Sequence, residues 1–373
     1  MDVYLIGASI ICFYFLSLTV ANHFAFKRLT LAPKKLGSPK VSVLIPARDE
    51  AHNLEACLDS LLKQDYSNFE ILVLDDHSRD GTAEILERYA KKYSNLRRFS
   101  GKTLPEGWLG KHFACQQLYE IADGEYFMFT DADTVHHEKC ISWALTNMQH
   151  HEVDFMSAYP RQKIGTLGEA LIVPGVYLVT SLFLPVWLIP RTKHPDISFA
   201  IGQFIIGRAK AFQTVGGYEN IKDSLVDDVS MVRAMKTAGL KTLFLDGKDF
   251  IECRMYDSYR HAFGGLVKNV YAALDKSPAR LALVFAMFTT IILFPVIYLS
   301  YQIVTGGDQI MLAALPVGIF FSMWFISLRE RKLPFYVPFL YPLLFLNLMI
   351  ISLVSAARTG YGKGALWKGR LVK

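Results

Sequence analysis

The stretch FMFTDADT, residues 127–134, decides the fold, because an apolar run ends there directly in two aspartates. Residues 126–130 have the aromatic and apolar composition of a buried strand. Two earlier runs of the same kind, 41–45 (VSVLI) and 70–74 (EILVL), predict two more strands. Short apolar runs of this length predict a sheet that is covered on both faces.

Helical patterns lie between the predicted strands, with apolar residues recurring on one face of each helix. These faces consist of Leu54, Cys57, Leu58, Leu61 and Leu62, then Ala83, Leu86, Tyr89, Ala90 and Tyr93, and later Ala114, Leu118, Ile121 and Ala122. The alternation predicts an α/β fold with a mostly parallel, Rossmann-like sheet built from crossover units.

Polar residues follow each predicted strand at once. The first strand leads into Pro46–Glu50 (PARDE), the second into residues 75–78 (DDHS), and the third into residues 131–133 (DAD). In parallel α/β sheets, ligands bind beyond the carboxyl ends of the strands. No G-x-G-x-x-G follows the first strand, which argues against a dinucleotide cofactor. We therefore expect a crevice lined by carboxylates.

Asp131 and Asp133 are the candidate metal ligands. If the chain is extended here, the two side chains lie on the same side, because alternate residues share a face. Two carboxylates so close need a proton, a cation or strong hydrogen bonds. Mg²⁺ or Mn²⁺, bridging to a diphosphate, would meet that need. The alternative is a solvated turn, which the D-x-D triplet alone also fits.

The remaining polar candidates each have a structural alternative. Asp75 and Asp76 suit hydrogen bonds from a base or a ribose, but they could simply open a turn. Lys111, after Gly110, offers a cation for a diphosphate from a flexible turn, or it could be a surface lysine that caps a helix. Asp227 and Asp228 open a helical pattern, where acidic residues favour the helix dipole, and a carboxylate there could also act as a general base.

Apolar stretches bracket this predicted domain. Residues 3–26 are almost wholly apolar and long enough to cross a bilayer, and Lys27 and Arg28 follow them. We predict a transmembrane anchor over residues 1–27 that is not cleaved, with the next residues in the cytoplasm by the positive-inside rule. Three further stretches, 281–304, 309–328 and 335–357, predict three membrane segments within residues 280–357.

Two membrane assignments remain open. Three C-terminal crossings would place the basic tail, residues 358–373, outside the cell, so one stretch, best the one with Pro334, Pro338 and Pro342, could be re-entrant or interfacial. Residues 167–190 are apolar but interrupted by prolines, which favours an interfacial helix pair over a span.

Composition limits the classes of protein. Hydrophobic residues make up 52% and charged residues 20% of the 373-residue chain, as expected for a mixture of soluble and membrane parts. The net charge of +6 comes from basic residues beside apolar segments, which argues against nucleic acid as a partner. The five cysteines, Cys12, Cys57, Cys115, Cys140 and Cys253, form no C-x-x-C pair and suit a reducing compartment.

Several segments, in order, resemble family 2 glycosyltransferases of the GT-A fold. They are PARDE, LDDHSRDGT, GWLGKHFA, FTDADT, FAIGQFIIGRAKAFQTVGGYE and LVDDVSM, and the agreement covers about residues 40–260. Within the family, GWLGKHFACQQL, CRMYDSYRHAFGGLVKN and the terminal LWKGR are similar to carotenoid-acid glycosyltransferases of the 4,4'-diaponeurosporenoate type. Ceramide and hopanoid-associated glycosyltransferases resemble the chain less closely.

The resemblance implies a GT-A catalytic domain over residues 38–275 and an inverting transfer of one hexose. The donor would be a nucleotide-sugar, and the resemblance to the family favours UDP-glucose. The acceptor would be a lipid or a carotenoid acid. Donor contacts would come from Pro46, Arg48, Asp49, Glu50, Asp75, Asp76, Lys111, Asp131 and Arg254. Gln203 and Asp227 would border the acceptor, Asp131 and Asp133 would hold Mg²⁺ or Mn²⁺, and Asp228 would be the base.

One departure bears on the acceptor. Processive members of the family carry Q-x-x-R-W after the base, whereas this chain has Cys253-Arg254-Met255-Tyr256. The missing tryptophan favours the transfer of a single sugar. With the predicted membrane anchor, the resemblance implies that this transfer takes place at the cytoplasmic face of the cell membrane, in glycolipid or carotenoid biosynthesis. A polyprenyl-phosphate glycosyltransferase, a processive polysaccharide synthase and an inactive nucleotide-binding subunit remain the alternatives.

Overall fold

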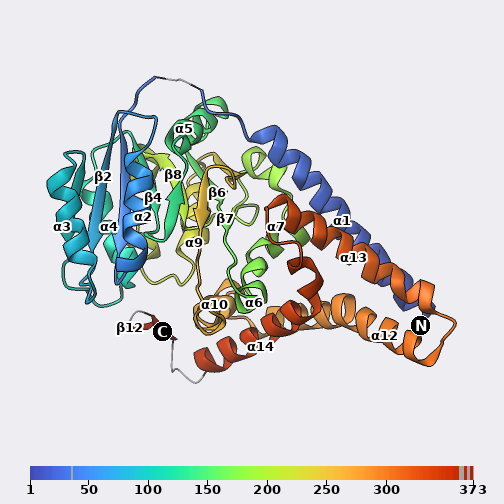
Figure 1. Ribbon diagram of the computed structural model, residues 1–373. Helices are drawn as coiled ribbons and strands as arrows, with labels where there is room; N and C mark the ends of the chain where they lie inside the picture. The colour runs from blue at the N-terminus through green and yellow to red at the C-terminus, as the bar shows by residue number, and fades with distance from the viewer. Residues whose placement is uncertain (35–36, 361–364, 368–369, 373) are drawn as a thin grey trace. The chain divides into compact units, whose positions relative to one another are not determined.

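The computed structural model describes residues 1–34, 37–360, 365–367 and 370–372. The chain forms two compact units, each made of separate segments. The helical unit consists of Met1–Ala25, Gln162–Val186 and Met255–Lys373, and the sheet unit consists of Phe26–Arg161 and Trp187–Arg254. Both units are drawn in Figure 1.

The sheet unit is built on seven strands in the order β3-β2-β1-β4-β8-β6-β9. Their bounds are β1 (Val41–Ala47), β2 (Phe69–Asp75), β3 (Leu96–Ser100), β4 (Tyr126–Thr130), β6 (Phe155–Tyr159), β8 (Phe204–Arg208) and β9 (Thr242–Asp246). β8 runs antiparallel to both β4 and β6, whereas the other neighbouring strands are parallel. The predicted α/β fold with a mostly parallel sheet is confirmed.

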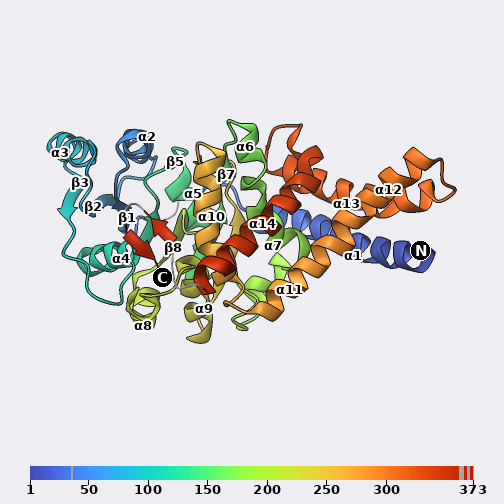
Figure 2. The ribbon, with the colours of Figure 1, turned by 90° about the horizontal axis from the view of Figure 1, so that it is seen from below.

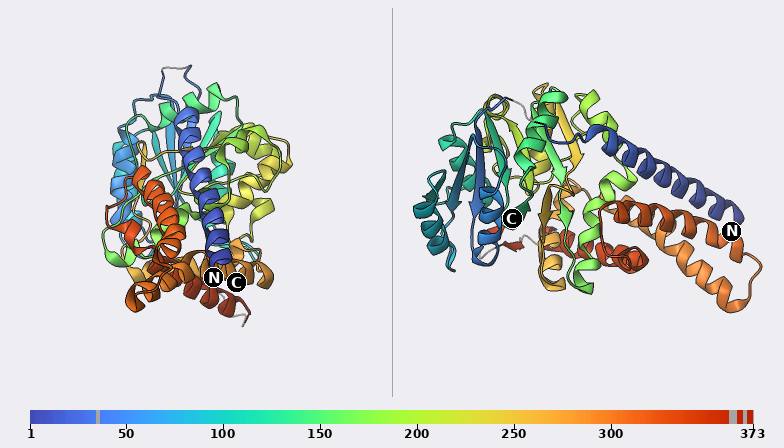
Figure 3. Two further views of the ribbon diagram at one scale, coloured as in Figure 1. Left: turned by 90° about the vertical axis from the view of Figure 1, so that its right-hand side faces the viewer. Right: turned by 45° about the horizontal axis from the view of Figure 1, so that its top comes forward.

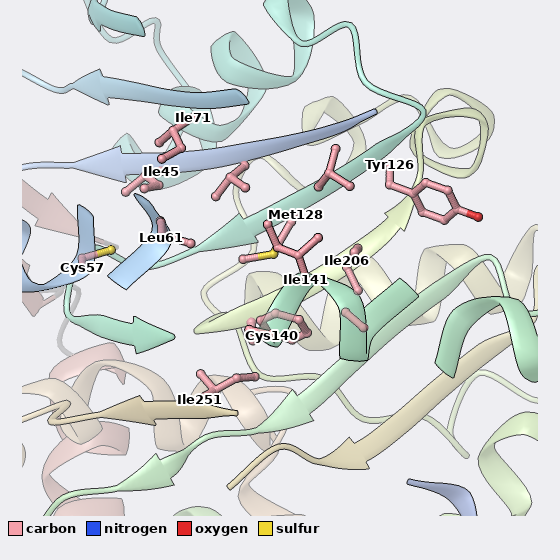
Figure 4. Close-up of a cluster of buried hydrophobic side chains, with 14 of the residues drawn as sticks. Ile45, Cys57, Leu61, Ile71, Tyr126, Met128, Cys140, Ile141, Ile206 and Ile251 are labelled. Atoms are coloured by element: carbon pink, nitrogen blue, oxygen red, sulfur yellow. The ribbon is translucent and has the colours of Figure 1, made fainter. Parts of the chain in front are cut away.

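Helices cover both faces of this sheet. One face packs on α2 (Ala51–Leu62), α3 (Thr82–Lys92) and α5 (Cys140–His150), and the other on α4 (Gly110–Ile121), α8 (Ala209–Val215) and α9 (Asp227–Thr237). Figure 4 shows part of the first core, where Ile45 and Met128 from neighbouring strands meet Leu61 of α2 and Ile141 of α5. The alternating side chains of β1 divide between the two cores, with Val43 in one and Leu44 in the other.

Smaller elements complete the sheet unit. A second sheet contains β5 (Thr134–His136), β10 (Ile251–Cys253) and, at the boundary of the unit, β7 (Arg161–Gln162). β5 and β10 are antiparallel, with Thr134 opposite Cys253. Two short 3₁₀ helices are η2 (Val186–Arg191) and η3 (Glu219–Ile221).

The helical unit contains the long apolar helices. Its elements are most of α1 (Asp2–Leu29), then α6 (Leu167–Ala170), η1 (Val173–Tyr177), α7 (Leu178–Leu182), α10 (Tyr259–Ala273), α11 (Pro278–Met287), η4 (Phe288–Leu293), α12 (Phe294–Thr305), α13 (Ile310–Glu330), η5 (Val337–Leu340), α14 (Tyr341–Gly360), β11 (Ala365–Trp367) and β12 (Arg370–Val372). α11, η4 and α12 form one continuous helix (Figure 2).

Among the described residues, four helices are long and apolar enough to cross a membrane: Asp2–Leu29, Pro278–Thr305, Ile310–Glu330 and Val337–Arg358. The start of α1 lies beside the loop between α12 and α13, where Gln309 Nε2 donates to Asp2 Oδ1 at 2.7 Å (Figure 3). At the other end, His23 Nδ1 of α1 lies 2.8 Å from Glu330 Oε2 of α13. α1 and α13 therefore run side by side in the same direction.

Residues 167–190 form four short helices, α6, η1, α7 and η2, and not the predicted pair. Prolines lie at two of the breaks, with Pro174 in the first turn of η1 and Pro185 directly before η2. Their interfacial location remains a prediction. The predicted domain boundaries also remain predictions. Residues 361–364, 368–369 and 373 of the predicted basic tail, and with them part of LWKGR, lie outside the described residues.

Candidate functional site

Three loops of the sheet unit meet at the carboxyl ends of β1, β2 and β4. β1 lies between the other two strands, with Ala47 opposite Asp75 and Leu44 opposite Phe129. The segments that follow these strands therefore share one edge of the sheet, as the sequence predicts.

The first group of site residues joins the loops after β1 and β2. Arg48 Nη1 donates to the Asp76 carbonyl at 2.6 Å and lies 3.7 Å from Asp76 Oδ2. Asp49 Oδ1 accepts from Arg79 N at 2.7 Å, and Asp75 Oδ1 accepts from Ser78 N at 3.0 Å. Asp49, Asp75 and Asp76 thus lie together, as predicted, and they also hold the loop in shape. Asp49 has a φ of 51°, a left-handed conformation that a non-glycine residue adopts infrequently.

Two further predicted donor residues lie beside this group. Pro46 is within β1, opposite Leu74. Glu50 starts α2: its N–H donates to Thr82 Oγ1 at 2.9 Å, and its Oε2 accepts from Asn53 Nδ2 at 3.0 Å. Burial is the main cause that raises the pKa of Asp131, and the charge of the nearby Glu50 carboxylate adds to it. Glu50 therefore links the first group of carboxylates to the second.

The second group surrounds Lys111, in the first turn of α4. Lys111 Nζ lies 2.7 Å from Asp131 Oδ1 and 3.6 Å from Asp227 Oδ2. Burial alone would lower the pKa of Lys111, but these carboxylates outweigh it and raise that pKa well above its ordinary value. Lys111 therefore stays charged. Gly110 is the first residue of α4, so the predicted flexible turn there is wrong.

Asp228 lies next to this group, in the first turn of α9. Its two carboxylate oxygens accept from backbone N–H groups, Oδ1 from Val229 at 2.8 Å and Oδ2 from Gly202 at 2.9 Å. Burial and the neighbouring Asp227 raise the pKa of Asp228 to about 7. A carboxyl group with that pKa is matched to proton transfer near neutral pH. Asp228 therefore lies at a helix terminus and is also a candidate base, and these are the two roles that the sequence allows.

Asp133 lies in a turn, and not in an extended chain as the sequence argument assumed. β4 ends at Thr130, and Thr134 N donates to the Asp131 carbonyl at 3.2 Å, which closes a tight turn over the triplet. The Asp131 carboxylate still lies close enough for its charge to affect the pKa of Asp133. Burial first, and then the charges of Asp131 and Glu50, raise the pKa of Asp133 to about 7.

A buried cysteine and glutamine lie behind Asp133. Cys253, at the end of β10, hydrogen-bonds through its thiol to Asp133, and Gln203 Nε2 donates to Cys253 Sγ at 3.0 Å. Burial and the Asp133 charge raise the pKa of the Cys253 thiol well above its ordinary value, so it remains protonated. Gln203 is thereby near the carboxylates. Arg254, directly after β10, is exposed.

The carboxylates at this edge match the chemistry of a hard divalent cation. Among the described residues, no group of three or more His, Cys, Asp and Glu side chains forms a complete metal site. Asp133 and Asp131 can therefore supply only part of a coordination shell. Such a partial set fits Mg²⁺ or Mn²⁺, which commonly keep waters and take substrate phosphate oxygens as further ligands.

Sequence reasoning missed Gly202, which lies in the wall of the site. A Cβ built on Gly202 would lie 3.2 Å from Lys111 Nζ, 3.8 Å from Asp228 Oδ2 and 3.9 Å from Asp227 Oδ2. The sequence signal that could have identified Gly202 is its place next to Gln203, directly before β8. Cys253 was also missed, because a lone cysteine in the sequence carries no sign of its neighbours.

Part of the chain matches the model of a known protein family. Residues 42–216 match the model described as Glycosyl transferase family 2. The matched region contains the loops after β1, β2 and β4, together with Lys111 and Gly202. It ends before Asp227 and Asp228.

Two curated relatives are similar over more than half of this chain. The 4,4'-diaponeurosporenoate glycosyltransferase of Staphylococcus haemolyticus is 26% identical over 228 residues, which are 58% of this chain and 57% of the relative. The beta-monoglucosyldiacylglycerol synthase of a Nostoc species is 26% identical over 221 residues, 58% of this chain and 44% of the relative. The chain thus matches only about half the length of these relatives.

A solved structure matches nearly the whole chain. It is the mannosyltransferase PcManGT from Pyrobaculum calidifontis, in complex with GDP-Man and Mn²⁺. The TM-score is 0.58 at 17% sequence identity, and the match covers 97% of this chain and 99% of that one. At this identity the match shows a shared fold.

Proposed function

Because this chain contains a glycosyl transferase family 2 domain, we propose that it is an inverting glycosyltransferase that moves one sugar from a nucleotide-sugar to a lipid at the cytoplasmic membrane face. One observation carries the proposal: within a few ångströms, Asp131, Asp227 and Asp228 surround Lys111 and Gly202 at the carboxyl edge of the sheet. That edge is where α/β folds of this type bind ligands.

The donor end is the group around Arg48. Asp49, Asp75 and Asp76 offer carboxylate oxygens to a base or ribose, and Lys111 offers a charge to a diphosphate. Asp131 and Asp133 would hold Mg²⁺ or Mn²⁺, which would neutralise the leaving diphosphate when bound. PcManGT is described with Mn²⁺ and GDP-Man, which supports a metal and a nucleotide-sugar. UDP-glucose is the donor that we propose to test first.

Asp228 is the proposed general base. With a hydroxyl acceptor such as diacylglycerol, its carboxylate would take the proton of the hydroxyl while that oxygen attacks the anomeric carbon and the bond from this carbon to the diphosphate oxygen breaks. A carotenoid acid would attack through its carboxylate, which is already deprotonated at neutral pH and leaves no proton for Asp228 to take. The two backbone N–H donors from Val229 and Gly202 hold both oxygens in place. A base fixed in this way needs little reorganisation in the transition state. Gln203 and Asp227 would border the acceptor, and Arg254 is proposed as a contact of the leaving group.

The lipid acceptor is proposed from the membrane helices and the relatives. The names of the two curated relatives describe transfer to a carotenoid acid and synthesis of a glucosyl diacylglycerol. Basic residues lie at or beside one end of α1, α11 and α13: Lys27 and Arg28, Lys276 and Arg280, then Arg329, Arg331 and Lys332. The other ends carry Asp2 and a 306–309 loop without Lys or Arg. This asymmetry favours a cytoplasmic site.

The test is transfer by purified protein in liposomes. With UDP-[¹⁴C]glucose and a carotenoid-acid or diacylglycerol acceptor, we expect a hydrophobic product that carries a single hexose by mass spectrometry. A GDP-mannose arm and a polyprenyl-phosphate arm test the alternative donor and acceptor. A water-soluble polymer would instead favour a processive synthase. No transfer with any acceptor, at intact donor binding, would favour the inactive nucleotide-binding subunit.

A further inference from the structure

The helix α14 meets the length and hydropathy of a membrane span, but its surroundings differ from those of the other three candidates. Half of its most apolar stretch is buried within the protein, against 39% for Asp2–Leu29, 33% for Ile310–Glu330 and 17% for Pro278–Thr305. In Figure 1, α14 runs across the direction of α1 and α13, which run side by side. The elements that cover α14 account for this difference in burial.

An amphipathic helix, α10, which carries several basic side chains, follows α14 along much of its length. Tyr259 OH, at the start of α10, donates to Asn347 Oδ1 at 2.7 Å, and Tyr271 N, near its end, donates to Ser355 Oγ at 3.1 Å. Figure 2 shows the two helices next to each other. Between these contacts α10 carries Arg260, His261 and Lys268. If α14 crossed the hydrocarbon, these side chains would enter it as well, which is strongly unfavourable.

The two sides of α14 differ in chemistry. Its buried side carries Asn347, Ser352 and Ser355, whose polar atoms are hydrogen-bonded within the helical unit. Its exposed side is a stripe of four residues, Leu343, Leu346, Ile350 and Leu353, which are 46–55% exposed. Their spacing of three and four residues places them on one helix face. A stripe of this kind needs an apolar environment along one side only, which is the property of a helix that lies in a membrane surface.

The distribution of charge leads to the same conclusion. If α1, α11–α12 and α13 cross, the basic end of each lies on one side, and the chain after Lys332 starts on that side. A fourth crossing by α14 would carry residues 358–373, which include five Lys and Arg, to the opposite side. A helix that stays in the surface leaves them on the basic side, in accordance with the positive-inside rule.

We infer that α14 does not span the bilayer but lies along its cytoplasmic surface, with the stripe Leu343, Leu346, Ile350 and Leu353 in the lipid. The partner is the cytoplasmic leaflet, and three of the four candidate helices in the described part of the chain span the bilayer. The inference rests on the proposed membrane location of the protein. In this position α14 also supports the 167–182 segment at the level of the lipid surface, because Asn347 Nδ2 donates to the Leu171 carbonyl at 3.1 Å and Leu348 lies against Gly175.

Sidedness is tested on the full chain with single added cysteines and a membrane-impermeant maleimide. The native cysteines in the described structure are buried, and the unsubstituted chain is the labelling control. Asp308→Cys should react in intact cells, whereas Lys332→Cys and Arg358→Cys should react only after permeabilisation. Reaction of Arg358→Cys, but not of Lys332→Cys, in intact cells would show that α14 spans. A protected Asp308→Cys would overturn the proposed topology itself, and this inference with it.

Depth is tested with a fluorophore on cysteines at the four stripe positions in phosphatidylcholine and phosphatidylglycerol liposomes. Lipids with a doxyl group at carbon 5 should quench all four probes more strongly than lipids with a doxyl group at carbon 12. Probes at Leu283 and Ile297, both exposed on the continuous α11–α12 helix, should show the graded depths of a span. Deep probes at Leu346 and Ile350 beside shallow ones at Leu343 and Leu353 would contradict the inference.

Discussion

At the scale of single residues, the site depends on how Asp228 is held. Its pKa of about 7 arises mainly from burial and then from Asp227. A base must be deprotonated, so we expect kcat/KM to rise as the pH rises through about 7. Asp228→Asn keeps the size and the helix-terminal position but removes the basicity, so turnover should fall by about 10²-fold or more. The measurement is a pH–rate profile with donor affinity recorded in parallel.

The result for Asp228→Asn separates catalysis from structure. Unchanged donor affinity with lost turnover would support the role of a base. Near-normal turnover in this variant, with the same rise near pH 7, would leave Asp228 as a helix-terminal residue only.

Gly202 leads to a second prediction at this scale. Because an added Cβ would lie 3.2 Å from Lys111 Nζ, Gly202→Ala should displace the Lys111 ammonium group, whereas Asp228 Oδ2, at 3.8 Å, would stay in ordinary contact. Misplacement on the order of 1 Å can cost about 10²-fold in rate, and we expect a fall of about 10-fold or more in kcat/KM. Gly264→Ala in α10 is the control, since a Cβ there meets nothing within 4 Å. Equal kinetics for the two variants would refute the crowding argument.

Metal binding provides a third prediction. Asp133→Asn removes one carboxylate from the partial set and should weaken Mn²⁺ binding in the presence of a nucleoside diphosphate by about 10-fold or more, since a hard cation prefers charged oxygens. Isothermal titration of the purified protein measures this directly, without turnover. Asp123→Asn, whose carboxylate is exposed and pairs with Lys40, serves as the control. Wild-type Mn²⁺ affinity in Asp133→Asn would remove this residue from the metal site.

At the scale of elements, the sequence predicts more of the order of strands and helices than of the geometry of the site. Strands over 41–45, 70–74 and 126–130 were predictable because buried parallel strands are continuous apolar runs. The antiparallel direction of β8 was not predictable, because the pattern of apolar residues does not indicate in which direction a strand runs relative to its neighbours. The turn over residues 131–133 depends on the β5–β10 pairing, with Thr134 opposite a residue more than a hundred positions later. Gly202 and Cys253 reach the site through similarly distant contacts.

α9 provides a prediction about how one element is held. Lys236 Nζ donates to the carbonyls of Ile189 and Thr192, both at 2.8 Å, and its side chain is almost fully buried. This ties the helix of Asp228 to η2. Lys236→Met keeps the stem but leaves two carbonyls without this donor, which should cost about 2–6 kcal/mol of stability at about 1–3 kcal/mol per buried group.

Thermal unfolding in detergent should show the loss for Lys236→Met, and hydrogen exchange should show faster opening of residues 187–200. Lys210→Met, at an exposed position on α8, is the matched control and should leave both measurements close to wild type. Unaltered exchange of 187–200 in Lys236→Met would mean that other contacts hold η2 to α9.

At the scale of the whole molecule, the sequence predicted where apolar segments lie but not what each one touches. Residues 335–357 have the hydropathy of a span, and the tertiary contacts of α14, above all those with α10, distinguish it from α13. The same limit applies to the 167–190 segment. Its composition predicts lipid contact, yet Leu182 is completely buried while Phe183, the next residue, is 52% exposed. Which of its apolar side chains can meet a lipid is decided by tertiary packing.

The lipid-acceptor proposal is therefore tested best at Phe183. Its exposed ring follows α7, and a charge there should hinder a lipid that approaches over this segment, because an ionised side chain disfavours apolar contact. We expect Phe183→Asp to reduce glycolipid formation in liposomes by about 10-fold, with hydrolysis of the donor little changed. Ile121→Asp, at an exposed apolar position of α4 in the sheet unit, should affect neither reaction. If Phe183→Asp lowers donor hydrolysis as much as lipid glycosylation, the segment supports the fold of the enzyme and the lipid reaches Asp228 by another route.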